Sequence, residues 1–209
     1  MDSCFYHPIS GPPVPRLTHS GLVGLTIRNA TPGDLSDLAD VLARSFHSEQ
    51  GINRWLFPLL RLGIYEDLRH RLLLSPPVRY VCLVASGAVS EASSDRLGLA
   101  GTVELTLRSF PPHPLFESHY LYISNLAVRH ESRRQGVAQQ LLYACERTAI
   151  EWGFSDIYLH VLEDNHEARQ LYTKLGYRLK IAEDTWSSWL FGKPRQLFLH
   201  KRLAESVST

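Results

Sequence analysis

The run Arg133-Arg134-Gln135-Gly136-Val137-Ala138 has the residue types and spacing of a loop that binds a pyrophosphate. It follows an apolar strand predicted at 120–128 and opens a helical stretch at 139–152. The first turn of a helix has backbone N–H groups without intrahelical partners and the positive end of the helix dipole, so an anion is favoured there. Gly136 allows close approach of the backbone to a ligand, small Ala138 keeps the first turn uncrowded, and arginines donate charge-assisted hydrogen bonds to phosphate. The run therefore predicts an anion site at the helix start.

A second group of polar and aromatic residues follows downstream, in the order Asn165, Ala168, Leu171, Tyr172, Gly176 and Tyr177. Together with Leu175, its members recur at helical spacing and predict an apolar helix face, on which an aromatic side chain can pack. Asn165 stands just before this helix, where asparagine is a favoured N-cap. On the helix pattern alone, Tyr172 and Asn165 have structural roles.

The elements that hold these residues follow from hydrophobic periodicity and from the positions of Pro and Gly. Strands are predicted at about residues 22–29, 78–85, 97–107, 120–128, 156–162, 177–181 and 196–201. Helices are predicted from Thr31-Pro32-Gly33-Asp34 to Phe46 and at about 59–74, 139–152 and 166–175. The pattern predicts an α/β fold with about seven strands and about four helices.

Three stretches lie outside this pattern. Residues 1–21 are rich in proline and predict a flexible or extended arm. Residues 86–95 are rich in Gly, Ser and Ala and predict a long hairpin connection, whereas the prolines of residues 109–117 interrupt regular structure and mark a candidate substrate-side loop. Residues 22–209 are therefore expected to form a single domain.

Composition excludes several classes of partner. With 22 basic and 21 acidic residues, the net charge is +1, which gives no bulk attraction to nucleic acid or to an acidic membrane surface. Cys4, Cys82 and Cys145 lack the spacing of a zinc site or a disulfide framework, so we expect no metal and a reducing compartment. No run approaches 18 apolar residues, and the N-terminus lacks an apolar signal. We expect a cytoplasmic protein, or one of the plastid stroma if the chain is a processed form.

The segment Leu126-Ala127-Val128, the arginine-rich loop and the residues from Asn165 to Tyr177 come in one order, and together they resemble the GNAT N-acetyltransferase superfamily. Arg133-x-x-Gly136-x-Ala138 fits its Arg/Gln-x-x-Gly-x-Gly/Ala signature, and the downstream residues fit its Asn...Ala...Leu-Tyr...Gly-Tyr/Phe segment. The order of strands and helices agrees over about residues 22–203. The resemblance implies a central twisted mixed sheet, splayed between the fourth and fifth strands and flanked by helices.

The resemblance also implies acetyl-CoA as cosubstrate and no metal. Unpaired backbone groups between the splayed strands would bind the pantetheine arm, as an added strand binds a sheet edge. The residues implied to bind the cosubstrate are Leu126, Ala127, Val128, Arg133, Arg134, Gln135, Gly136, Val137, Ala138, Gln139, Asn165, Ala168 and Tyr172.

The implied reaction is direct attack of a neutral amine on the acetyl thioester in a ternary complex, without an acyl-enzyme. Tyr172 matches the family position of the general acid for the departing thiolate. Many relatives of the ribosomal-protein N-terminal acetyltransferase type have a glutamate five residues before the matching asparagine, whereas this chain has His160 there. His160, Glu104, His119 and Glu163 are candidates for the base, and a base acting through ordered water is an alternative.

The acceptor amine stays open in the sequence. Tyr120-Leu121-Tyr122-Ile123-Ser124-Asn125 is similar to cyanobacterial and plastid-type GNAT enzymes, a branch implied to acetylate protein N-termini and lysines. Trp186, Trp189, Phe110 and His113 are candidates for the walls of a peptide groove, or for core or lid aromatics. Three functions follow: a protein N-terminal or lysine acetyltransferase, monomeric or homodimeric; a small-amine acetyltransferase; and an acyl-CoA-binding regulatory module without transfer.

Overall fold

The computed structural model describes residues 25–46, 57–74, 77–87, 98–109, 119–183 and 194–203. Its strands are β1 (Thr26–Asn29), β2 (Tyr80–Ser86), β3 (Leu99–Ser109), β4 (His119–Val128), β5 (Asp156–Leu162), β6 (Arg178–Glu183) and β7 (Gln196–Arg202). Its α-helices are α1 (Leu35–Phe46), α2 (Phe57–Arg69), α3 (Val137–Glu151) and α4 (His166–Lys174). Short 3-10 turns lie at Pro32–Asp34 and His130–Ser132, and a π-helical turn at His70–Leu74 follows α2. The predicted order and types of the elements are confirmed.

The seven strands form one mixed sheet in the order β1-β2-β3-β4-β5-β7-β6. Neighbouring strands are antiparallel, except that β4 and β5 are parallel. Parallel neighbours need a crossover connection, and α3 provides it here. The predicted mixed sheet is confirmed.

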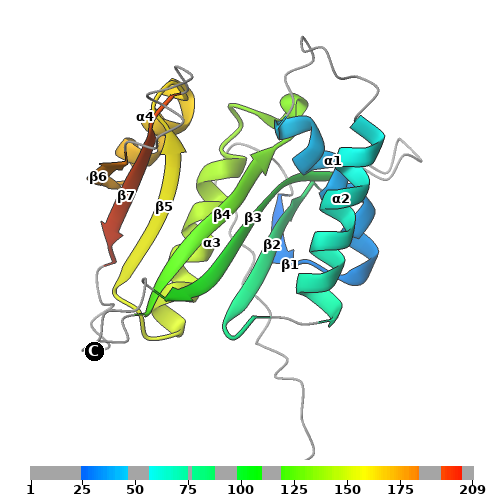
Figure 1. Ribbon diagram of the computed structural model, residues 1–209, viewed down its shortest axis with the longest axis horizontal. Coiled ribbons are helices and arrows are strands. Elements are labelled where there is room, and N and C mark those ends of the chain that lie inside the picture. Colours follow the sequence, from blue (N-terminus) through cyan, green and yellow to red (C-terminus); the bar gives the residue numbers. More distant parts are fainter. Residues whose placement is uncertain are drawn as a thin grey trace, which may run out of the picture.

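The ladder between β4 and β5 is short. It contains three residue pairs, Leu121–Ile157, Tyr122–Tyr158 and Ile123–Leu159. Beyond them, residues 124–128 continue their ladder with β3 and residues 160–162 with β7, but not with each other. Figure 1 shows the two strands diverging toward their carboxyl ends. These two stretches are called the splayed segments below, and they confirm the predicted splay.

The strands β2, β3 and β4 contribute side chains to two cores, because successive residues of a strand point to opposite faces of the sheet. On one face, α3 and α4 pack over fully buried residues such as Leu105 and Leu121. On the opposite face, α1 packs its leucines over β2 residues such as Val84. The two cores explain why the strands have nearly continuous apolar runs.

A third, smaller cluster lies on another part of the sheet. It contains Tyr122 of β4, Tyr158 of β5 and Phe198 of β7, with Tyr120 packed against it. We call these residues the aromatic face. Tyr122 lies two residues before Ser124, which pairs with Glu104, and alternation therefore places the aromatic face on the same side of the sheet as Glu104.

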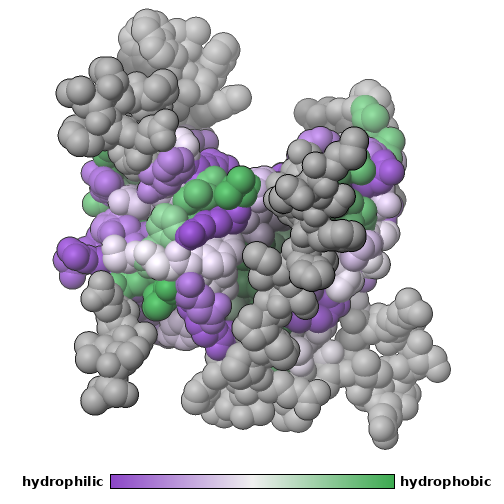
Figure 2. Space-filling model, turned by 90° about the horizontal axis from the view of Figure 1, so that it is seen from below, coloured by the Kyte–Doolittle hydropathy of each residue, from purple (hydrophilic) through white to green (hydrophobic). Residues whose placement is uncertain are grey.

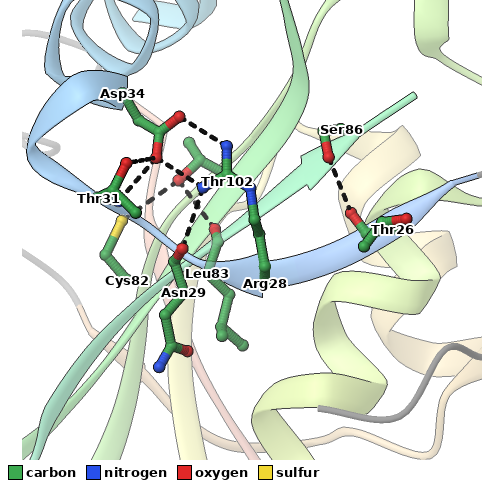
Figure 3. Close-up of polar contacts among 9 residues, drawn as sticks. All are labelled: Thr26, Arg28, Asn29, Thr31, Asp34, Cys82, Leu83, Ser86 and Thr102. Carbon is green, nitrogen blue, oxygen red and sulfur yellow. Dashed lines mark hydrogen bonds and ion pairs between the residues drawn. The ribbon is translucent and has the colours of Figure 1, made fainter. Parts of the chain in front are cut away.

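The start of α1 is fixed by a charged cap, drawn in Figure 3. The backbone N–H and the hydroxyl of Thr31 each donate to Oδ2 of Asp34 at 2.7 Å. Arg28 of β1 donates to both Asp34 oxygens, also at 2.7 Å. These hydrogen bonds from Arg28 are the main reason that the pKa of Asp34 is lowered to about 2. The cap joins β1 to α1 and confirms the helix start predicted at Thr31-Pro32.

Two helix boundaries differ from the sequence predictions. The helix α3 begins at Val137, earlier than the predicted Gln139, because Gly136 at φ 82° ends the loop directly before it. The region predicted at 59–74 divides into α2 and the π-helical turn. The arm at 1–21 and the stretch at 88–95 lie outside the described residues, so the division of the chain into an arm and one domain stays a prediction.

The surface of the described residues has a mixed character. Figure 2 shows hydrophilic and hydrophobic residues interspersed on the face seen from below. Exposed apolar side chains include Leu59 and Leu62 on α2, and Leu179 and Ile181 on β6, which is an edge strand of the sheet. None of the described helices is long and apolar enough to cross a membrane.

Candidate active site

The loop between β4 and α3 has the backbone conformation of an anion site. Arg134 and Gly136 adopt left-handed conformations with φ 63° and 82°. Gly136 is the N-cap of α3 without a side-chain cap, and the first hydrogen bond of the helix runs from the Gln140 N–H to the Gly136 carbonyl at 3.0 Å. The N–H groups of residues 137–139 precede this bond and are the groups that a helix start offers to an anion. A Cβ on Gly136 would meet nothing within 4 Å, so the approach to its backbone is open.

The side chains of this loop form hydrogen bonds and an ion pair with other groups of the protein. Arg134 pairs with Glu167 in the first turn of α4, with Nη2 and Oε1 2.5 Å apart. Arg133 Nε donates to the Val128 carbonyl at 3.4 Å, and Gln135 donates to the Glu131 carbonyl at 2.8 Å. The Arg134–Glu167 pair is highly exposed, and exposed pairs contribute little stability. Breaking the Arg134–Glu167 pair therefore costs little stability.

Two residues that no sequence motif singled out position the loop. A Cβ on Gly101 of β3 would lie 2.8 Å from the Ala127 carbonyl and 3.2 Å from Val137, so a larger residue would separate β3 from β4 and from the start of α3. Arg129 donates from Nε to the Leu99 carbonyl at 2.7 Å, which holds the end of β4 to the start of β3. The sequence feature that could have indicated the role of Gly101 is its position inside a strand pattern, because a glycine there marks close approach of another backbone.

A β-bulge shapes the splayed segment of β4. Thr102 pairs with Ala127 and Glu104 pairs with Ser124, so two β4 residues, Asn125 and Leu126, face one β3 residue. Asn125 has φ 52°, a left-handed conformation that asparagine tolerates better than most residues. The bulge redirects the backbone of β4 directly beyond its last pair with β5. The only sequence feature that could have indicated the bulge is the asparagine, because asparagine tolerates a left-handed conformation.

The helix α4 places Asn165 and Tyr172 near the end of β5. Asn165 is the N-cap, and its Oδ1 accepts a hydrogen bond from the Ala168 N–H at 3.1 Å, so its predicted capping role is confirmed. Tyr172 is 6% exposed and packs in the α3 core, with its ring 5.7 Å from that of Tyr177. Burial raises the pKa of the Tyr172 phenol, so the hydroxyl keeps its proton at neutral pH.

His160 is the first β5 residue beyond the ladder with β4. Its Nδ1 lies 3.0 Å from the hydroxyl of Tyr122, with which it shares a hydrogen bond. Its ring stacks on Phe198 of β7, with the centroids 4.6 Å apart. His160 is thus held against the aromatic face at the point where the two strands part. Sequence patterns did not single out Tyr122 as its partner.

Glu104 is 1% exposed and lies in β3 between Cys82 of β2 and Ser124 of β4. Its Oε2 pairs with Arg71 of the π-helical turn, which also binds Asp67 at 2.5 Å. Burial raises the pKa of Glu104, and the attraction of Arg71 opposes that rise. The residue faces the side of the sheet that carries Tyr122, and its carboxylate is already bound to a cation.

The other two base candidates lie elsewhere. His119 is exposed at the beginning of β4, opposite Ser109. It precedes Ser124 by five residues, roughly 16 Å along an extended strand. The side chain of Glu163 is exposed just beyond β5, and its backbone N–H donates to the Arg195 carbonyl. The structure thus brings His160 and Glu104 toward the splayed segments, and leaves His119 distant.

Several predicted features lie outside the described residues, namely Phe110, His113, Trp186 and Trp189. Among the residues that are described, no group of three or more His, Cys, Asp or Glu side chains is arranged to hold a metal ion. Cys82 and Cys145 are buried free thiols.

Comparison with known families gives the class of protein. A family model described as the acetyltransferase (GNAT) family matches residues 38–177, which is more than half of the chain. The chain belongs to the GNAT acetyltransferase family. This match confirms the family resemblance inferred from the two sequence motifs. Acetyl-CoA is the acyl donor that this family uses.

Similar sequences occur among plant proteins. GCN5-related N-acetyltransferase 10, chloroplastic, of Arabidopsis thaliana is 32% identical over 172 residues, a match that covers 78% of this chain and 66% of the relative. GCN5-related N-acetyltransferase 7, chloroplastic, of the same plant is 39% identical over 85 residues, covering 41% of this chain and 31% of the relative. The chain thus spans less than two thirds of the length of these curated relatives.

Similar solved structures include N-terminal acetyltransferases. Arabidopsis thaliana NAA60 in complex with a bisubstrate analogue has a TM-score of 0.64 at 17% identity, over 86% of this chain and 99% of that one. Chaetomium thermophilum Naa20 with a bisubstrate analogue has a TM-score of 0.60 at 19% identity, over 87% and 88%. The ribosomal-protein-S18-alanine N-acetyltransferase of Escherichia coli has a TM-score of 0.58 at 14% identity, over 88% and 97%. At these identities, the likeness shows the fold.

Proposed function

We propose that the protein transfers the acetyl group of acetyl-CoA to a primary amine, which is the α-amine of a protein N-terminus, a lysine ε-amine, or both. The observation that supports this most is the pair of splayed segments between the loop that follows β4 and the helix that follows β5. Carboxyl ends of parallel strands meet at one edge of a sheet, where ligands of open α/β sheets bind. The Arg134–Glu167 pair joins the loop to α4 across this edge.

The cosubstrate fits the donors present. The N–H groups at the start of α3 suit a pyrophosphate, and the splayed segment of β4 suits the pantetheine amides, because its outer edge has no strand partner. Arg133, Arg134 and Gln135 supply side chains to the phosphates. The residues proposed to bind acetyl-CoA are those named from the sequence, residues 126–128 and 133–139 with Asn165, Ala168 and Tyr172.

Two side chains are proposed to move protons. His160 accepts the proton of the attacking amine, since a neutral imidazole nitrogen is a proton acceptor and this ring lies where the strands part. For Nε2 of His160 to accept that proton, Nδ1 must carry the ring hydrogen and donate a hydrogen bond to the Tyr122 oxygen. Tyr172 donates its phenolic proton to the departing thiolate, so that the amine gains the acetyl group and CoA leaves as the thiol.

The acceptor is proposed to be a peptide amine. The similar structures of NAA60 and Naa20 hold bisubstrate analogues, and the E. coli neighbour is named for N-acetylation of an alanine of ribosomal protein S18. The chloroplastic names of the relatives favour the plastid stroma over the cytoplasm as its compartment. Monomer or homodimer stays a prediction.

The test is acetyl-CoA turnover on matched peptides with a free or a blocked N-terminus, each made with and without a lysine, beside a panel of small amines. Turnover that needs a free N-terminus supports α-amine transfer, and turnover that needs lysine supports ε-amine transfer. A preference for small amines would replace the peptide proposal with the second function. Saturable acetyl-CoA binding without turnover on any acceptor would favour the binding module.

A further inference from the structure

Arg108, near the end of β3, is fixed beside the reacting residues. Its guanidinium carbon lies 3.7 Å from the centroid of the Tyr122 ring. The Tyr122 hydroxyl in turn shares the 3.0 Å hydrogen bond with His160. The Arg108 side chain is exposed, so its N–H groups remain within reach of a ligand in solution. A cation over a tyrosine ring loses mobility without losing its charge.

The charge of Arg108 is not neutralised within the described part of the chain. No ion pair joins it to a carboxylate there, whereas two carboxylates on the same side of the sheet, Glu104 and Asp156, have a cationic or an imidazole partner. Glu104 pairs with Arg71, and Asp156 Oδ1 lies 2.6 Å from His200 Nε2. A second cation, the Lys180 ammonium, lies 4.7 Å from the centre of the Tyr158 ring, and Tyr158 is the ladder partner of Tyr122. Arg108 therefore places a positive charge on the aromatic face, beside the proposed base.

An arginine held by its flat face over an aromatic ring presents its edge to a ligand, and that edge matches a carboxylate with two parallel hydrogen bonds. A cation at this place attracts an acceptor that carries a nearby carboxylate and repels one that carries a second cation. We propose that Arg108 is a specificity-determining residue that binds a carboxylate of the acceptor close to its amine. This inference rests on the proposed transfer at the same site.

The carboxylate has two chemical sources. In a peptide acceptor it is an Asp or Glu side chain within the first few residues, and in a free amino acid it is the α-carboxylate. Peptide acceptors with basic residues at the same positions would be disfavoured, because their charge meets Arg108 and the neighbouring Lys180. The proposed class is thus an amine with an anionic neighbour, most simply an acidic protein N-terminus.

The experiment compares peptides that are identical except for Asp, Asn or Lys at the second and third residues, together with free amino acids and their amides. kcat/KM is measured for the wild type, Arg108→Gln, Arg108→Lys and a matched control, Arg147→Gln, which lies on α3 at the other face of the sheet. We expect the wild type to prefer the Asp peptide over the Asn peptide by about five- to tenfold, a preference that shrinks as salt rises. Arg108→Gln should reduce that ratio to about one, Arg108→Lys should retain part of it, and Arg147→Gln should keep it whole.

Equilibrium binding of the same peptides in the presence of CoA separates this inference from the proposed function. If the chain binds but does not acetylate, the proposed function fails, while an Arg108-dependent preference in binding still supports the carboxylate site. A preference that only the free amino acids show assigns the carboxylate to a small acceptor. Equal ratios in the wild type and Arg108→Gln, for both peptides and amino acids, would overturn the inference.

Discussion

The hydroxyl of Tyr122 and Nδ1 of His160 are 3.0 Å apart, and their hydrogen bond joins β4 to β5 just where the ladder between the two strands ends. The contact fixes the imidazole at the vertex of the splayed segments. The proposed base is thus held by a strand neighbour and by the ring of Phe198.

His160→Gln should lower kcat by about 10²- to 10⁴-fold, the range typical of a lost general base. Tyr122→Phe removes only the hydrogen bond, so it should lower kcat less while leaving the Phe198 contact of His160 in place. The measurement is kcat against pH for both variants and the wild type. A His160→Gln enzyme with unchanged rate and unchanged pH profile would exclude His160 as the base.

Glu104→Gln tests the other buried candidate. Because the pKa of Glu104 is raised by burial, the carboxyl stabilises the fold most while it is protonated, and this contribution falls as the pH rises from its ordinary value of 4.5 through the folded value. We therefore expect the stability of the wild type relative to Glu104→Gln to decline with rising pH in urea unfolding. The rising limb of the pH–rate profile should be the same in both proteins. Its disappearance in Glu104→Gln would make Glu104 the base.

Gly136→Val should weaken acetyl-CoA binding by at least about tenfold, because a β-branched residue at φ 82° strains the loop and its side chain enters the open approach to the backbone. Gly153→Val is the matched control, since Gly153 has φ 80° and equally open surroundings but lies beyond the other end of α3. Both variants should lose about 1–2 kcal/mol of stability. Calorimetric titration should show lost affinity in Gly136→Val alone, and equal affinities in the two variants would contradict the phosphate-loop assignment.

Asp34→Asn should destabilise the protein at neutral pH by about 1–2 kcal/mol, a value discounted for the partial exposure of Arg28. The pKa of Asp34 is lowered to about 2, chiefly by its hydrogen bonds from Arg28. A lowered carboxyl pKa stabilises the fold above the unfolded value near 4, and that contribution is lost as the pH falls toward 2. Urea unfolding of the two proteins should therefore differ at pH 6 and converge near pH 2. A difference that is constant across this range would show that the Asp34 charge is not responsible.

Local sequence patterns predicted most of the fold, because each helix or strand has a recognisable pattern within a few consecutive residues. Alternation marked the strands, the Thr31-Pro32 start marked α1, and the arginine-rich run marked the loop before α3. The two motifs then fixed the family. Hydrophobic spacing also predicted the apolar face of α4, on which Tyr172 and Leu175 are buried.

The features that escaped prediction are those that depend on pairing between distant residues. The partner of His160 is Tyr122, on a strand whose register with β5 cannot be read from either segment alone. The bulge at Asn125, the close approach at Gly101 and the Arg71–Glu104 pair likewise need a strand or helix from elsewhere in the chain. Sequence spacing made Glu104 a candidate base but could not show that a cation already binds it.

Acetyl transfer with Tyr172 as the acid is tested most directly by the effect of Tyr172→Phe. Turnover with a peptide acceptor and affinity for acetyl-CoA are measured in parallel. The substitution removes only the phenolic oxygen from a buried ring whose pKa is raised by burial, so packing and cosubstrate binding should persist. The account predicts that kcat falls by about tenfold or more, while the Kd for acetyl-CoA stays within about twofold of the wild type. Wild-type turnover in Tyr172→Phe would contradict the proposed acid and, with it, transfer between the splayed segments as described.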